Sequence, residues 1–245
     1  KAGAQVTLVE RDTLASKASR GTFAWINATW AKQPRHYHRL NQMGLDGWHE
    51  LEQALNIPIR WGGSLEWFSS HERQVTLAAD IEEQARWGEA AEMLSGTEVN
   101  ALEPNLTVSA DDTIAYSGAD GALDPVVACQ RLAAGAQQYQ ARILEHCEVR
   151  SALSSDEGSV TLSTSLGDLA ADRYVVATGA DSLATQTLAG VTIPQRSTPG
   201  IIVMTKPLPR LIQRVIAAPG IHLHQRNDGK LVIGEQSGAP DNSAH

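Results

Sequence analysis

The sequence has few of the features that mark several large classes of protein. Its 245 residues include two cysteines, Cys129 and Cys147, which are too few for a disulfide scaffold or a cysteine-rich metal site. No apolar run approaches the roughly 18 residues of a membrane-spanning helix, and no signal peptide is visible. Acidic residues outnumber basic ones, and the net charge of −8 argues against a general nucleic-acid surface. These features are compatible with a soluble cytoplasmic enzyme, and we expect the protein to bind neither metal nor nucleic acid.

The first informative stretch lies near the start of the chain. Val6, Leu8 and Val9 form a short apolar run with the length and β-branching of a buried strand, and Glu10 follows at its end. In a dinucleotide-binding α/β fold, an acidic residue at the tip of the second strand accepts hydrogen bonds from a ribose diol. Many ordinary strands also end in an acid. By itself the pattern therefore leaves open a nucleotide site and a plain strand-to-loop junction.

A second stretch predicts another buried strand, over residues 173–180, which runs into Thr178-Gly179-Ala180 and then a helix. Small residues at the exit of a parallel strand let a cofactor lie against backbone N–H groups. A tight strand-to-helix turn would also need Gly179 for its backbone angles. Further along, Asn227-Asp228-Gly229 between two apolar runs predicts a β-hairpin.

The order of these motifs is more specific than any one of them. The chain resembles the FAD-dependent amino-acid and amine oxidoreductases, the superfamily of D-amino-acid oxidase, glycine oxidase and sarcosine oxidase, over nearly its whole length. The matching segments are Val6–Glu10, Ala18-Ser19-Arg20-Gly21, Leu102-Glu103-Pro104, Gly121-Ala122-Leu123-Asp124-Pro125, 175–182 and 227–234. The Gly-x-Gly-x-x-Gly loop of such proteins should lie about 20 residues before the acid, which is before Lys1. We therefore expect the chain to be truncated at both ends.

The resemblance implies an α/β fold in which a Rossmann-like FAD-binding domain, incomplete here, is interleaved with an α+β substrate domain built on an antiparallel sheet. It implies an FAD-binding domain over 1–55 and 115–195, without its first strand and Gly-rich loop. It implies a substrate domain over 56–114 and 196–245, without its C-terminal part. We expect the 245 residues alone to bind FAD weakly and to be inactive.

The resemblance also implies FAD as the cofactor. The positions that match its contacts are Glu10, Arg11, Ser19, Arg20, Val149, Thr178 and Gly179. A substrate carboxylate would need a clamp of hydrogen-bond donors, and the candidates from the predicted substrate domain are Arg60, Tyr116, His222 and His224. A structural role is open for each of these four. The catalytic residues stay unknown, because a neutral amine needs no protein base.

The implied chemistry is oxidation of a C–N bond of an amino acid or secondary amine by hydride transfer to flavin N5, which leaves an imine that water hydrolyses. The implied partners are a small-molecule amine or amino acid and an electron acceptor, which is oxygen, a quinone or another protein. Two alternatives stay open. One is a non-catalytic flavoprotein-like subunit or binding module, and the other is a 2-hydroxy-acid oxidoreductase on the same scaffold.

Overall fold

The computed structural model describes residues 3–154, 158–194 and 200–235, and these form parts of two compact units. Unit 1 consists of Lys1–Thr22 and Pro125–Pro199, and unit 2 consists of Phe23–Asp124 and Gly200–His245. Each unit is therefore built from two separate stretches of the chain. Residues 23–55 and 115–124, which the sequence interpretation assigned to the FAD-binding domain, belong to unit 2, because their strands pair with other strands of that unit.

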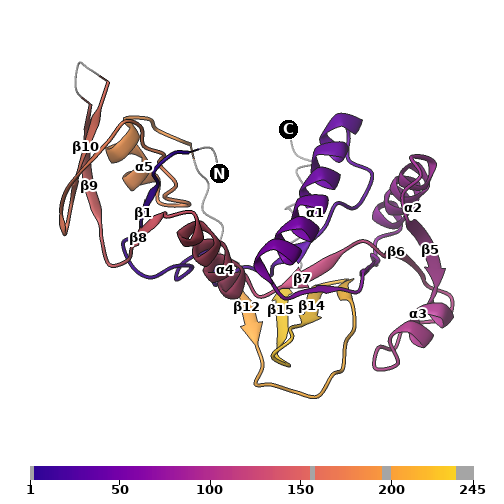
Figure 1. The fold of residues 1–245 in the computed structure, drawn as a ribbon. Helices are drawn as coiled ribbons and strands as arrows, with labels where there is room; N and C mark the ends of the chain where they lie inside the picture. The colour runs from indigo at the N-terminus through magenta and orange to yellow at the C-terminus, as the bar shows by residue number, and fades with distance from the viewer. Residues whose placement is uncertain (1–2, 155–157, 195–199, 236–245) are drawn as a thin grey trace. The chain divides into compact units, whose positions relative to one another are not determined.

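Unit 1 contains a parallel strand pair and an antiparallel sheet. Strand β1 (Thr7–Val9) pairs in parallel with β8 (Arg142–Leu144), with Val9 opposite Leu144. Helix α4 (Pro125–Gln138) precedes β8. The three-stranded sheet has the order β11 (Gly167–Ala171), β10 (Val160–Thr164), β9 (Val149–Ser154). Helix α5 (Ser182–Ala189) packs against β9, beside the long β9–β10 hairpin in Figure 1.

The predicted buried strand over residues 173–180 is not present. Residues 174–178 pair with no strand in the described part of the chain, and the side chain of Val175 is 90% exposed. An apolar run becomes a buried strand only where neighbouring strands take up its backbone hydrogen bonds and another layer covers its side chains. In the described ranges β1 has one neighbour only, and Val6 and Leu8 are exposed.

Unit 2 is built on a seven-stranded sheet. In spatial order its strands are β12 (Ile202–Met204), β15 (Leu231–Glu235), β14 (Ile221–Gln225), β13 (Val215–Ala218), β4 (Ser64–Glu66), β6 (Thr113–Ser117) and β5 (Ala91–Ser95). All neighbours are antiparallel except β13 and β4. The predicted hairpin is confirmed: β14 and β15 are joined by Asn227-Asp228-Gly229, and Gly229 has a φ of 82° that suits glycine.

A smaller sheet and three helices complete unit 2. The sheet has the order β2 (Trp25–Ile26), β7 (Gly121–Leu123), β3 (Ile59–Trp61). The helices are α1 (Arg35–Leu55), α2 (His71–Arg86) and α3 (Gly96–Leu102). Figure 1 shows α2 and α3 near β5 at one end of the large sheet. None of the helices in the described ranges is both long enough and apolar enough to cross a bilayer.

The large sheet has one apolar face and one face with a row of polar side chains. Leu65, Ile114 and Ile216 are fully buried in a hydrophobic cluster, and Leu223 packs against it. Because successive residues of a strand point to opposite faces, their neighbours lie on the other side of the sheet. The polar residues of that second face include Ser64, Glu66, Ser117, His222 and His224. This face is where unit 2 gathers groups capable of chemistry.

Candidate functional site

In unit 1, Glu10 lies directly after β1 and is held there by the adjacent strand. Its N–H donates to the carbonyl of Leu144 (2.8 Å), and its carbonyl accepts from the N–H of Cys147 (2.9 Å). The carboxylate oxygen Oε1 accepts from the N–H of Asp12 (2.7 Å), and no described residue donates to Oε2. A half-buried carboxylate with one open oxygen at the end of a parallel strand fits the ribose of a dinucleotide.

A hydrogen bond joins this segment to the turn before α5. Arg11 Nη1 donates to Asp181 Oδ2 (3.2 Å), and the N–H of Asp181 donates to the carbonyl of Thr178 (3.2 Å). The hydrogen bond from the N–H of Ala184, followed by that from Arg11, holds the pKa of Asp181 below its ordinary value. The structure therefore brings two of the predicted cofactor segments together, although they lie far apart in sequence.

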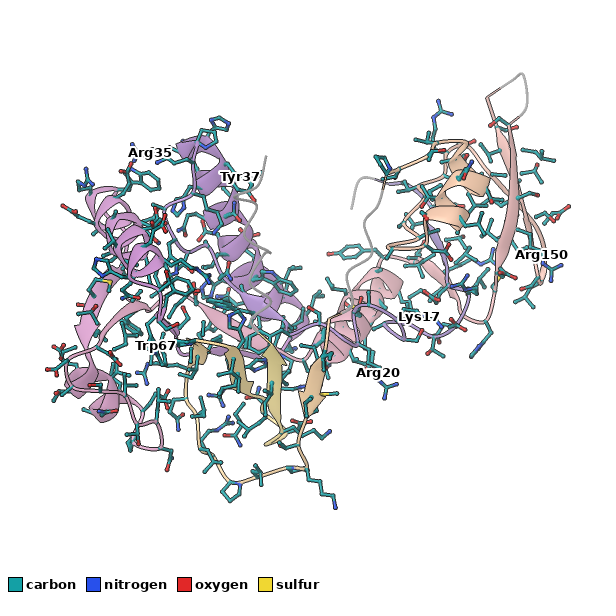
Figure 2. All side chains as sticks on the ribbon, turned by 180° about the vertical axis from the view of Figure 1, so that it is seen from behind. Lys17, Arg20, Arg35, Tyr37, Trp67 and Arg150 are labelled. Atoms are coloured by element: carbon teal, nitrogen blue, oxygen red, sulfur yellow. The ribbon has the colours of Figure 1, made fainter. Side chains whose placement is uncertain are left out.

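The other predicted cofactor residues are placed as follows. Val149 begins β9, two residues after Cys147, and is half-buried. Gly179 has a φ of 61°, which a residue with a side chain rarely adopts. Ser19 and Arg20 lie on a series of tight turns, and Arg20 points away from the ribbon in Figure 2. Their side chains make no hydrogen bond with any described residue, so they are free to contact a ligand.

In unit 2, two of the predicted substrate residues lie together on the polar face of the sheet. His224 Nε2 donates to the carbonyl of Phe23 (2.8 Å), which leaves His224 Nδ1 as an acceptor that is buried and without a partner in the described structure. The Nε2 atom of His222 is also buried and has no partner there. Buried polar atoms in native proteins are nearly always hydrogen-bonded. The open nitrogen of His222 therefore points to a ligand.

Aromatic rings surround these histidines. The ring of Phe23 lies 4.8 Å from that of His224, edge to face, and 5.8 Å from that of His222. The indole of Trp25 meets His222 edge to face, with 6.1 Å between centroids. Burial lowers the pKa of both histidines. Both are therefore neutral at pH 7, and each neutral ring has one nitrogen that donates and one that accepts.

The remaining two predicted substrate residues are placed differently. Arg60 Nη2 donates to the carbonyl of Gln213 (2.7 Å), so its guanidinium is tied to a loop, although it lines a small pocket that His224 also lines. Tyr116 lies on the apolar face, where it packs against the hydrophobic cluster and beneath the guanidinium of Arg214. The sheet therefore separates Tyr116 from the two histidines.

The sequence interpretation missed a buried polar network on the same face. Asp120 is fully buried, and its Oδ2 accepts from Trp25 Nε1 (3.0 Å), Ser64 Oγ (2.7 Å) and Thr29 Oγ1 (3.3 Å). Its Oδ1 accepts from Ser117 Oγ (3.3 Å). In the sequence, Asp120 follows Gly118-Ala119 and precedes Gly121, a pattern that is typical of an exposed turn. No sequence signal distinguishes it from such a residue.

A second acid, Glu66, extends this network along β4. Trp30 Nε1 donates to Glu66 Oε2, and Lys32 donates to the carbonyl of Thr29. Burial is the main cause that raises the pKa of Glu66 and of Asp120 and lowers that of Lys32. No group of three or more metal-binding side chains gathers here or elsewhere in the described residues.

Replacing Glu66 with glutamine tests the cost of this burial. Because the folded protein raises the pKa of Glu66 above its ordinary value of 4.5, folding favours the protonated form. As the pH rises from this ordinary value through the pKa of the folded state, the wild type loses stability that the Gln variant keeps. We expect the free energy of unfolding of Glu66→Gln, relative to wild type, to increase between about pH 4 and about pH 7.5 in urea titrations. Glu92→Gln, an exposed residue of β5, should show no such trend. If the difference in free energy of unfolding between Glu66→Gln and wild type decreases as the pH rises, the raised pKa of Glu66 is contradicted.

A match to a family model decides which family this is. The model described as FAD dependent oxidoreductase (DAO) matches residues 1–245, the whole chain. The chain belongs to this family of FAD-dependent oxidoreductases. FAD is therefore the cofactor of its family, as the resemblance implied. The open oxygen of Glu10 and the unbonded side chains of Ser19 and Arg20 fit that cofactor.

Individual relatives agree with the family match. A D-amino acid dehydrogenase of Vibrio vulnificus (strain YJ016) is 29% identical over 145 residues, which are 58% of this chain and 35% of that protein. An L-proline dehydrogenase structure from P. horikoshii has a TM-score of 0.80 at 22% identity, over 96% of this chain and 64% of that one. An L-α-glycerophosphate oxidase structure from Mycoplasma pneumoniae with FAD bound has a TM-score of 0.79 at 20% identity, over 94% of this chain and 64% of that one.

The two structures confirm the predicted fold class, an α/β flavoprotein fold with interleaved domains. The chain spans about a third of the length of the Vibrio relative and less than two thirds of each of the two structures.

Proposed function

We propose that this protein uses FAD to oxidise a C–N bond of an amino acid or a secondary amine. The observation that carries the proposal is the match of the whole chain to the FAD-dependent oxidoreductase family. The substrate class is supported by the relatives, because one is a D-amino acid dehydrogenase and another an L-proline dehydrogenase. Proline is a secondary amine that carries a carboxylate, which suits a site with polar and aromatic groups.

We propose that unit 1 holds the adenosine part of FAD. Glu10 would accept hydrogen bonds from the ribose diol, with Arg11 kept in place by Asp181. Val149, Thr178 and Gly179 would line the cofactor from β9 and from the turn before α5. Ser19 and Arg20 would contact the pyrophosphate, since a guanidinium and a hydroxyl both donate to phosphate oxygens. When bound, FAD supplies the hydride acceptor that no side chain of the protein can provide.

We propose that His222 is the substrate-contacting residue of unit 2. Its buried, unpartnered Nε2 would bond a polar group of the substrate, and the rings of Phe23 and Trp25 would exclude water around it. His224 supports it by fixing the carbonyl of Phe23. Arg60 and Tyr116 are weaker candidates, because Arg60 is engaged with Gln213 and Tyr116 faces the hydrophobic cluster.

The proposed activity is tested on the protein purified at its natural length. We expect it to be yellow, with flavin absorbance that bleaches when a D- or L-amino acid or secondary amine is added without oxygen. We also expect a keto acid and ammonia from an amino acid, or a carbonyl compound and a primary amine from a secondary amine. A protein that takes up no FAD overturns the assignment. If the protein binds FAD but none of these amino acids and amines reduces the flavin, the non-catalytic binding module is favoured instead.

One comparison favours a second function, oxidation of a C–O bond. The glycerophosphate oxidase neighbour shares the fold across 94% of this chain, and the substrate in its name, glycerophosphate, is an alcohol phosphate. The same assay separates the two proposals, because a hydroxy substrate gives a carbonyl product and releases neither ammonia nor an amine. Flavin reduction by 2-hydroxy acids, and not by amines, would select this alternative.

Replacing His222 with alanine tests its role. We expect the KM for the amino acid to rise about tenfold with a smaller change in kcat, since one substrate hydrogen bond is worth about 1–1.5 kcal/mol. Steady-state kinetics measures both constants, with the amino acid or amine that is found to reduce the flavin as the substrate. His49→Ala is the matched control, because His49 also lies in unit 2 against an aromatic ring, that of Trp61. An equal rise of KM in both variants would argue for a general structural effect.

A further inference from the structure

One fully buried carboxylate lies close to the proposed substrate site and takes no part in the proposed chemistry. Asp120 receives hydrogen bonds from four side chains, those of Trp25, Thr29, Ser64 and Ser117. Two of these donors are on β4 and β6 of the large sheet, and the other two belong to the segment 25–29. The carboxylate therefore fastens that segment onto the polar face of the sheet.

The backbone before Trp25 is held at the carbonyl of Phe23 by His224 Nε2 (2.8 Å) and at the carbonyl of Ala24 by the N–H of Leu123 (3.3 Å), but neither bond fixes the indole ring. Strand β2 has two residues and lies at the edge of the small sheet, where β7 is its one partner among the described strands. An indole N–H can only donate, so the ring orientation of Trp25 depends on its acceptor, which is Asp120 Oδ2 at 3.0 Å.

The indole that Asp120 fixes is also the one that packs edge to face against His222. His222 has no hydrogen bond from its buried Nε2 to a described residue, so ring packing by Trp25 and Phe23 determines where that nitrogen points. A chain of contacts thus runs from the carboxylate of Asp120 through the indole of Trp25 to the imidazole of His222.

We propose that Asp120 is a positioning residue of the substrate site, which fixes the indole of Trp25 and through it the imidazole of His222 in the orientation that the substrate meets. The inference rests on the proposed function for the role of His222. The linkage between the three side chains can be tested without any substrate.

The first experiment is nuclear magnetic resonance of the protein labelled at histidine and tryptophan. The signals of Trp25 and His222 are assigned from Trp25→Phe and His222→Gln. In Asp120→Ala we expect the Trp25 indole N–H signal to move and the pKa of His222 to rise toward its ordinary value of 6.5, because a loosened indole admits water to the imidazole. Asp120→Asn should restore much of the wild-type pattern, since its amide oxygen still accepts from the indole.

The matched control is Glu103→Ala. Glu103 is also fully buried in unit 2 but binds the backbone of Gln213 and Arg214, on a different segment. We expect it to leave the signals of Trp25 and His222 in place. Equal changes in both variants, or none in Asp120→Ala, overturn the proposal. If Asp120→Ala does not fold, Trp25→Phe decides, because it removes the N–H and keeps the carboxylate. If the pKa of His222 is unchanged in Trp25→Phe, the proposed linkage from Asp120 through Trp25 to His222 is overturned.

The second experiment uses as substrate the amino acid or amine that reduces the flavin in the anaerobic assay described above. We expect Asp120→Ala to raise KM about tenfold with less than about a threefold change in kcat, and Asp120→Asn to lie between it and wild type. An unchanged KM in Asp120→Ala overturns the positioning role. If no substrate reduces the flavin, the proposed function fails, while the resonance experiment still decides the linkage.

Discussion

Replacing Glu10 with alanine is expected to weaken FAD binding about 30- to 100-fold, since charge-assisted hydrogen bonds contribute about 1.5–3 kcal/mol each and water replaces part of the loss. The backbone of Glu10 is fixed on both sides by Leu144 and Cys147. Its Oε1 is held by the N–H of Asp12. The carboxylate is therefore already oriented before a ribose arrives. Titration of the apoprotein, at its natural length, with FAD and detection of flavin fluorescence gives the dissociation constant.

The structure offers a close control for Glu10. Glu145 directly follows β8, the parallel neighbour of β1, so that the two acids end adjacent strands. Its carboxylate differs in being exposed and in accepting the N–H of Leu14 (2.6 Å). We expect Glu145→Ala to change FAD affinity less than about threefold, because losing an exposed hydrogen bond within the protein costs little. Equal weakening in both variants, or no weakening in Glu10→Ala, contradicts the assignment of the ribose to Glu10.

Replacing Glu103 with alanine is expected to lower the free energy of unfolding of unit 2 by about 3–5 kcal/mol, as when one partner of a buried ion pair is removed. The carboxylate is fully buried. Its oxygens accept from the N–H groups of Gln213 (3.0 Å) and Arg214 (2.8 Å) and from the Arg214 guanidinium (3.3 Å). Truncation leaves two backbone N–H groups without an acceptor. It also leaves a largely buried guanidinium without its counter-charge, with only the carbonyl of Leu102 (3.0 Å) as a described acceptor.

Urea unfolding followed by circular dichroism and tryptophan fluorescence measures this loss. Trp67 packs against the neighbouring hydrophobic cluster and reports on unit 2. Glu50→Ala removes an exposed acid from α1 and should stay within about 0.5 kcal/mol of wild type. A loss below about 1 kcal/mol in Glu103→Ala would mean that water or rearranged side chains satisfy the groups left behind.

Local patterns predicted those parts of the fold that depend on neighbours in sequence. The hairpin at Asn227-Asp228-Gly229 follows from backbone angles that few residues adopt, and strand β1 with Glu10 at its end follows from a short apolar run. The interleaving of two units was predicted from the order of motifs. The predicted domain boundaries, after residues 55, 114 and 195, stay predictions; the two compact units divide the chain after Thr22, Asp124 and Pro199.

Other predictions required knowledge of what covers a segment. Residues 174–178 have the composition of a buried strand, but no described strand takes up their hydrogen bonds. His38 lies in a helix with an exposed neighbour on each side, and yet it is 1% exposed and bonds Glu89 at 2.7 Å. In both places, whether the residue is buried depends on a segment that is far away in sequence. For His38 that segment contains Glu89, and for residues 174–178 no such segment is present among the described strands.

The sequence by itself indicated the family and its cofactor, because these depend on ordered short motifs whose chemistry is local. It also suggested the acid that we propose for the ribose. The tertiary structure decided which candidates share a surface. Alternation along each strand sends His222 and His224 to one face of the large sheet and Tyr116 to the other, and strand order brings Asp120 to Trp25. Register and sheet order arise from contacts between distant segments, since a strand acquires a buried face only when its neighbours are in place.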